Sequence, residues 1–171
     1  RKLMLAVCEG RRTNCRGMTQ EQLADALIEI GAYRAINFDG GGSSTMVVKN
    51  VMGDSYEVKN GASSLRNVST SVGVVNNQPY IGTAVSGKLE LSDKNILKGD
   101  YVEPYYKFFD ANAHVVAAEN VVLTSSDPQA VIKDGRVYLN TEGRHKIYAE
   151  FGGVRLEADV NVISDIQSAY I

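Results

Sequence analysis

The residues with the clearest potential for chemistry lie in one short segment, Asn37-Phe38-Asp39-Gly40-Gly41-Gly42-Ser43-Ser44-Thr45. Three consecutive glycines lose much chain entropy on folding, which suggests backbone conformations or close approaches that a Cβ would prevent. Successive N–H groups in such a turn can bind an anion, and Asp39 places a carboxylate beside them. The segment therefore suits a phosphorylated substrate. A tight loop in which Asp39 and Ser43 only cap backbone groups is an interpretation of equal weight.

The glycine segment matches neither of the common nucleotide-binding motifs. It lacks the lysine of GxxxxGK[ST], and no GxGxxG leads into a helix. The histidines, His114 and His145, lie far from Cys8 and Cys15 in the sequence, which argues against a zinc site. The sequence therefore predicts no metal and no cofactor. The two cysteines either pair in a disulfide, if the protein is exported, or stay reduced.

The elements that must position this segment alternate between strand and helix. Thr19 with Gln22 forms the signature of a capping box, and Gly31 is a helix stop, so residues 20–30 are predicted to be helical. Apolar residues on both sides of this helix predict short strands. These strands are expected at residues 3–7, 35–38, 45–48 and 68–75. Residues 1–82 are thus predicted to be an α+β unit with a mixed sheet and one clear helix.

The pattern of apolar and polar residues changes at residue 83. Helical periodicity disappears, and short alternating segments recur between turn signals such as Asp134-Gly135 and Gly152-Gly153. The predicted strands are 84–91, 101–109, 115–124, 130–133, 136–139, 145–151 and 154–163. This pattern predicts an all-β sandwich over residues 83–171. The segment is similar to bacterial Ig-like modules of cell-surface proteins, on Ser125-Ser126-Asp127-Pro128, Gly135-Arg136-Val137, Gly143 and the alternating strand ending at Val162.

The amino-acid composition and the net charge limit the kinds of molecule that the protein is expected to bind. Hydrophobic residues make up 44% of the 171 residues, so packed cores are expected. The formal net charge of −2 argues against nucleic acid as the main partner. No apolar run approaches the roughly 20 residues that a membrane span needs. The chain opens in an apolar segment without a signal peptide, and we expect residues upstream of it.

The glycine segment resembles the signature of a known protein family. Residues 37–46 resemble the NLDGGGSSTM signature of the phosphodiester glycosidase family. Further stretches resemble the family in the same order, namely Glu9-Gly10-Arg11, Gly17-Met18-Thr19, Ile30-Gly31-Ala32-Tyr33, Arg66-Asn67-Val68 and Val72-Gly73-Val74. Glu9 stands where the family usually has Asp, and Ser69-Thr70-Ser71 replaces its small-residue segment. Family members have about as much catalytic domain again before this point, so the resemblance implies a missing N-terminal half.

The resemblance implies a hydrolase that acts on a carbohydrate phosphodiester. Its chemistry would need a carboxylate to stabilise a sugar cation or to activate water, and donors to stabilise the leaving phosphate. The expected catalytic residues are Asp39 and Glu9, although Glu9 equally suits a salt bridge to an arginine. The expected substrate- and phosphate-binding residues are Arg11, Asn37, Gly40, Gly41, Gly42, Ser43, Ser44 and Arg66.

A second class of function stays open beside the enzyme. The first unit would then only bind glycan, and the sandwich would mediate attachment to a cell surface. In both interpretations the partner is a carbohydrate, with a cell-wall or surface glycan as a candidate, and we expect a secreted or cell-surface bacterial protein.

Overall fold

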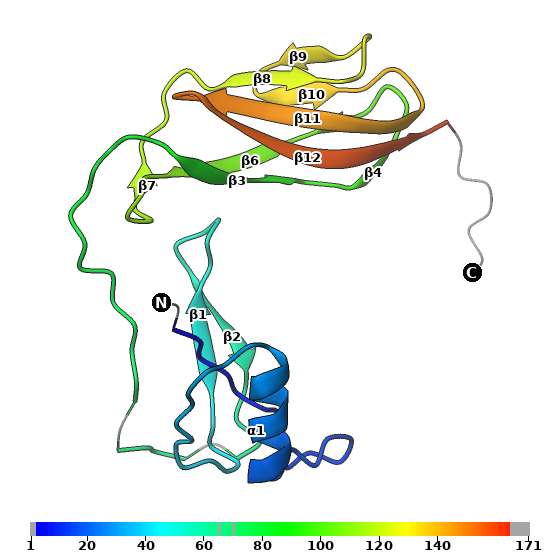
Figure 1. The fold of residues 1–171 in the computed structure, drawn as a ribbon. Coiled ribbons are helices and arrows are strands. Elements are labelled where there is room, and N and C mark those ends of the chain that lie inside the picture. Colours follow the sequence, from blue (N-terminus) through cyan, green and yellow to red (C-terminus); the bar gives the residue numbers. More distant parts are fainter. Residues whose placement is uncertain (1–2, 65, 70, 165–171) are drawn as a thin grey trace. The chain divides into compact units, whose positions relative to one another are not determined.

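The chain divides into two compact units in a computed structural model that describes residues 3–64, 66–69 and 71–164. The first unit is Arg1–Val75 and the second is Asn76–Ile171. Within the described residues the chain is largely β, with a single short helix (Figure 1). No helix in these ranges is long and apolar enough to cross a membrane.

The helix of the first unit, α1, spans Gln20–Glu29. The backbone N–H of Gln22 donates to Thr19 Oγ1 at 3.2 Å, and Gln22 Oε1 accepts from the backbone N–H of Thr19 at 2.9 Å. This reciprocal pair is the predicted capping box, which is confirmed. Gly31 follows with a φ of +88°, the left-handed conformation that ends a helix without steric cost when no Cβ is present.

The strands of the first unit form one antiparallel hairpin. β1 spans Met46–Lys49 and β2 spans Tyr56–Asn60, with Val47 opposite Val58. The side-chain oxygen of Asn50 accepts from two N–H groups of the turn between them. The strand predicted at 45–48 is therefore confirmed as β1, whereas β2 lies in a polar stretch whose sequence predicts no strand.

Three predicted strands of the first unit are wrong. Residues 3–7, 35–38 and the described part of 68–75 have no regular secondary structure. Leu3, Ile36 and Val75 keep 80%, 83% and 84% of their surface exposed. A strand needs a neighbouring strand to satisfy its backbone, and none is present among the described residues. The expected mixed sheet is thus reduced to the β1–β2 hairpin.

The first unit has no buried core of its own. None of its described residues is buried, and its exposed apolar side chains include Met4, Leu5, Phe38 and Tyr56. A unit that buries so little apolar area gains little free energy from folding by itself.

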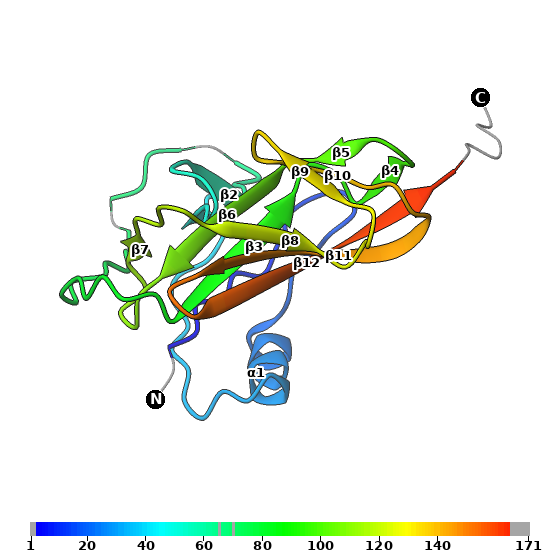
Figure 2. The same cartoon turned by 90° about the horizontal axis from the view of Figure 1, so that it is seen from above.

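The described residues of the second unit form ten strands. They are β3 Ser86–Leu91, β4 Asn95–Leu97, β5 Tyr101–Val102, β6 Pro104–Phe109, β7 Val115–Val116, β8 Val122–Ser125, β9 Val131–Lys133, β10 Arg136–Tyr138, β11 Gly143–Phe151 and β12 Val154–Ile163. Their sheets have the orders β3-β6-β7, β4-β12-β11-β8 and β5-β10-β9. The β12–β4 pair is parallel and the other pairs are antiparallel. Figure 2 shows β8, β11 and β12 side by side.

Two predicted hairpin turns fix the register of the longer strands. Gly152 and Gly153, with φ of +58° and +81°, join β11 to β12 so that Phe151 faces Val154. Asp134 and Gly135, with φ of +51° and +75°, join β9 to β10. Positive φ at both central residues suits the twist of a two-residue hairpin, and glycine adopts it most easily.

The core of the second unit lies on one face of the four-stranded sheet. Alternate residues of β11 and β12 point inward, as the alternation in the sequence predicted. In one cluster the inward residues of β11 and β12 pack against residues from β4, β5, β10 and the residue after β10. Its members are Ile96, Val102, Val137, Leu139, Ile147, Val160 and Val162. Another cluster joins the inward residues of β11 and β12 to β3, β6 and β7 and contains Ala84, Leu89, Phe108, Val116, Ala149 and Leu156. The same face therefore packs against both three-stranded sheets.

Residues 76–82 belong with the second unit, since a buried carboxylate holds them there. Asp110 accepts from the backbone N–H groups of Ile81 at 2.7 Å and Gly82 at 3.4 Å. Asn112 donates through its side chain to the carbonyl of Pro79 at 2.8 Å. Burial raises the pKa of Asp110, but hydrogen bonds from the backbone outweigh that effect and hold the pKa below its ordinary value.

A second buried carboxylate organises the chain between β8 and β11. Asp127 accepts from the backbone N–H groups of Gln129, Asn140 and Thr141, and the Thr141 hydroxyl donates to it at 2.5 Å. Burial raises its pKa, but these four donors stabilise the charged form more strongly and lower the pKa to about 2. His145 lies beside this group, with Nε2 2.9 Å from the carbonyl oxygen of Thr141.

Candidate functional site

The glycine loop leads directly into β1 and is tied to the chain that follows β2. Gly41 has a φ of +122°, a backbone conformation that favours glycine. Its carbonyl accepts from the N–H of Ser44 at 3.1 Å, which closes a turn. The carbonyl of Gly42 accepts from the backbone N–H of Ser64 at 2.9 Å and from the hydroxyl of Ser63 at 3.3 Å. The loop is therefore held in place through its carbonyl oxygens.

The N–H groups of the same loop have no protein acceptor in the described part of the chain. Within the described residues, no hydrogen bond is donated by the backbone of residues 40–43. Gly40 and Gly41 are exposed and Gly42 and Ser43 are half-buried, so these donors are accessible to a ligand. Four successive free N–H groups in a turn are the arrangement that binds anions in protein nests.

A hollow of about 480 Å³ opens beside these donors. It is lined by Arg11, Gly40, Gly41, Gly42, Ser43, Ser63, Ser64 and Arg66. The lining contains two guanidinium groups and no carboxylate. A positively charged, hydroxyl-rich concavity of this kind favours an anion such as a phosphate.

The two arginines reach the hollow from different parts of the chain. Arg66 donates from Nε to the hydroxyl oxygen of Ser43 at 3.1 Å, so it is oriented by the glycine loop itself. Arg11 lies at a bend in the loop before α1, with a φ of +53°. No ion pair occupies either guanidinium within the described residues, so both charges stay available to a ligand.

The structure gathers only some of the residues expected from the sequence. Arg11, Arg66 and residues 40–43 line the hollow together. Asp39 and Asn37 are exposed and do not line it.

The other two expected site residues have structural contacts in the protein. Glu9 Oε1 lies 3.0 Å from Nε of Arg12, so Glu9 forms the salt bridge to an arginine that its position also suited. Ser44 uses its carbonyl to accept from the side chain of Asn60 at 3.0 Å, and it does not line the hollow. Their roles in substrate binding or catalysis stay predictions.

Sequence reasoning missed the serines that close the hollow from the opposite side. Ser63 and Ser64 follow β2, in a polar stretch where hydroxyl residues are common and carry no signal by type alone. Only their pairing with Gly42 reveals them. An adjoining hollow is lined by Arg11, Arg12, Thr13, Asn14, Ala62 and Ser63. It shares Arg11 and Ser63 with the first, so the two hollows adjoin.

Residues 1–75 match the model of the phosphodiester glycosidase family. The match covers the whole first unit, including the glycine loop and both arginines of the hollow, and it confirms the resemblance found in the sequence. At the level of the family, it indicates a glycosidase-type enzyme that acts on phosphodiester-linked sugars. A comparison with curated proteins finds no match to this chain.

Proposed function

We propose that the first unit is part of the catalytic domain of a hydrolase that cleaves sugar-1-phosphodiesters. The bond broken is the one between the anomeric carbon and a phosphodiester oxygen. The observation that carries the proposal is the hollow lined by residues 40–43 of the glycine loop together with Arg11 and Arg66. This is a site for the phosphate of such a substrate.

The proposed reaction develops charge at two places that the protein must stabilise, the leaving phosphate and the anomeric carbon. As the C–O bond breaks, the oxygen and its electron pair leave with the phosphate, which becomes a phosphomonoester of the aglycone. The donors of residues 40–43, with Arg11 and Arg66, stabilise that anion. The anomeric carbon becomes cationic and takes up water. Asp39, directly before the loop, would stabilise that cation or activate the water. Glu9 would be a second catalytic residue, and Asn37 and Ser44 would bind the substrate.

The paired hollows suit the shape of a phosphodiester. Such a ligand has one anion in its middle and an arm on each side. Arg11 and Ser63 line both hollows, so a phosphate placed between these two residues would send one arm into each. The adjoining hollow offers hydroxyl, amide and guanidinium groups and only one apolar side chain, that of Ala62. The aglycone there would be polar, as in a glycan or a cell-surface polymer.

The first unit is proposed to be only a part of its catalytic domain. Its exposed apolar side chains, such as Leu3 and Ile36, form no core with the described residues of the unit. A further stretch of domain would cover them and would add walls to the hollow. For the second unit we propose an Ig-like module that acts as a spacer or attachment unit of a secreted or cell-surface bacterial protein.

One observation favours a second candidate function, a glycan-binding module without catalysis. Asp39 does not line the hollow, and the lining has no carboxylate. A site that only holds a sugar phosphate would have the same donors and would need no acid or base.

Turnover of an N-acetylglucosamine-1-phosphodiester by the full-length protein separates the candidates. We expect release of free sugar, and a fall in kcat of roughly two orders of magnitude in Asp39→Asn, because electrostatic contributions of this kind are worth about 3 kcal/mol each. Asp25→Asn on α1 makes the same charge change at another exposed position and is the matched control. Binding without turnover, or Asp39→Asn with normal turnover, would refute the assignment.

A further inference from the structure

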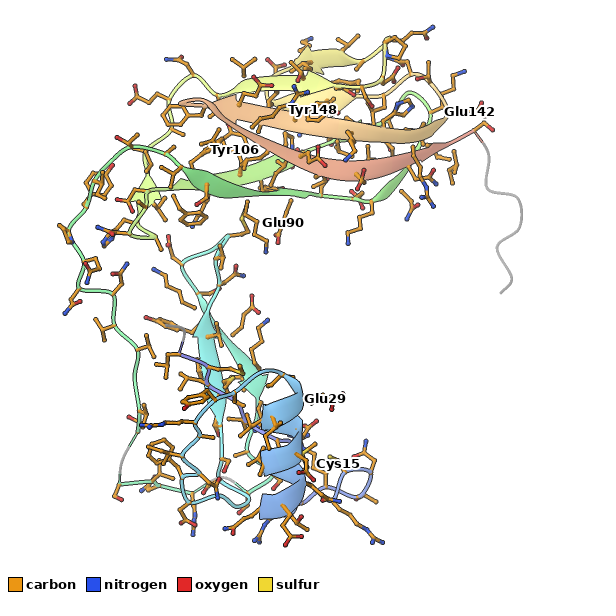
Figure 3. All side chains as sticks on the ribbon, viewed as in Figure 1. Cys15, Glu29, Glu90, Tyr106, Glu142 and Tyr148 are labelled. Atoms are coloured by element: carbon orange, nitrogen blue, oxygen red, sulfur yellow. The ribbon has the colours of Figure 1, made fainter. Side chains whose placement is uncertain are left out.

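Two thiols of the first unit converge on one backbone oxygen. Cys8 Sγ lies 3.3 Å and Cys15 Sγ 3.1 Å from the carbonyl oxygen of Glu9, and both thiols donate to it. The sulfurs are therefore no farther apart than these two hydrogen bonds laid end to end. Both cysteines are half-buried and unpaired. Figure 3 shows Cys15 in the loop that precedes α1.

The chain between the two cysteines carries the charges next to the hollows. Arg12 and Cys15 exchange backbone hydrogen bonds of 2.9 and 3.1 Å, so Cys15 sits at the base of a tight turn. The backbone N–H of Arg11 points to the carbonyl of Arg16 at 3.5 Å, a longer contact that holds Arg11 less firmly. Arg11 is thus placed by a short loop whose two ends are the two thiols.

We propose that Cys8 and Cys15 form a reversible disulfide that fixes the loop of Arg11. The thiolate of one cysteine attacks a small-molecule disulfide such as oxidised glutathione and releases one thiol. The thiolate of the other cysteine then displaces the second thiol and forms the protein disulfide. Two protons and two electrons leave the protein, and two molecules of reduced glutathione result. Both sulfurs already lie within hydrogen-bond distance of one carbonyl oxygen, so the two side chains point to the same place before they react.

Closing this loop restricts the backbone on both sides of Arg11. Fewer conformations then compete with the one that places its guanidinium at the hollows, so less ordering is needed when an anion binds. The consequence for anion binding rests on the proposed function. The disulfide itself does not, because it follows from the sulfur positions alone.

The first test counts thiols in the full-length chain equilibrated with oxidised glutathione. Cleavage after Glu9 and Glu21 puts the cysteines on separate peptides, which stay joined only if Cys8 and Cys15 are bonded. We expect the joined pair to predominate, and Cys8→Ser to give only a glutathione adduct at Cys15. Three results in the unaltered protein would overturn the proposal. They are thiols that stay free, a predominance of glutathione adducts on the cysteines, and a predominance of disulfides between two protein chains.

The second test measures the affinity of inorganic phosphate by NMR titration of the oxidised and reduced protein. We expect at least threefold tighter binding in the oxidised form, and no such difference in Cys8→Ser. Equal affinities after disulfide formation would overturn the positioning of Arg11 and leave the proposed function standing. Absence of phosphate binding in both forms would count against the anion site itself.

Discussion

Replacing Gly41 by alanine tests whether the conformation of the glycine loop is what binds the anion. An added Cβ at Gly41 would meet no atom within 4 Å, and the same is true of Gly40. The two positions differ in their backbone, because Gly41 has a φ of +122° and Gly40 has no such positive φ. Gly40→Ala is therefore a matched control that adds the same methyl group without the strain.

The size of the effect follows from the conformation. A residue with a Cβ in this region of φ carries about 1–3 kcal/mol of strain. The loop of Gly41→Ala would relieve that strain by turning its peptide groups, which would reorient the N–H groups of residues 40–43. A loss of about 2 kcal/mol corresponds to roughly thirtyfold weaker binding. Gly40→Ala should change the affinity by less than about threefold.

NMR titration with inorganic phosphate is the suitable assay, because it measures weak affinities and reports on the loop directly. In the unaltered protein we expect the amide signals of residues 40–43 to shift with phosphate. Gly41→Ala should need about thirty times more phosphate, while the signals of the second unit stay where they are. Equal affinities of Gly41→Ala and Gly40→Ala would refute the reasoning, because the special backbone would then be irrelevant to the site.

The remaining predictions concern the second unit. The Asp127 carboxyl has its pKa lowered from 3.8 to about 2, so its stabilising contribution is present above pH 4 and is lost as the pH falls through about 2. Chemical denaturation should show a contribution of about 2 kcal/mol at neutral pH, and Asp127→Asn should lack the part of the pH dependence between 4 and 2; an unchanged profile would contradict the assignment. A Cβ at Gly87 would lie 2.7 Å from the carbonyl of Lys107 and 2.9 Å from Leu156 Cδ1. Gly87→Ala should therefore lower the free energy of unfolding by about 2 kcal/mol, and a loss below about 0.5 kcal/mol would show that the sheet yields easily.

The success of sequence reasoning depended on whether an element is determined locally. The capping box at Thr19 and the turn at Gly152-Gly153 are each specified by a few adjacent residues, and both formed as expected. The glycine loop was found for the same reason. Its three glycines and the positive φ of Gly41 belong to one local turn.

The failures concern contacts between distant segments. The apolar residues 3–7 and 35–38 suggested buried strands, but a strand exists only where another strand pairs with it, and the described residues provide none. Ser63 and Ser64 could not be found, since their place at the hollow depends on the chain returning to Gly42 after β2. Asp39 does not line the hollow, and its catalytic role stays a prediction.

Hydrolysis of a sugar-1-phosphodiester by the full-length protein in water enriched in oxygen-18 tests the central claim most directly. A glycosidase breaks the bond at the anomeric carbon, and water supplies the new sugar hydroxyl. We therefore predict oxygen-18 in the released sugar and none in the phosphomonoester. Oxygen-18 in the phosphate would show attack at phosphorus, and it would contradict the assignment of this site to glycosidic bond cleavage.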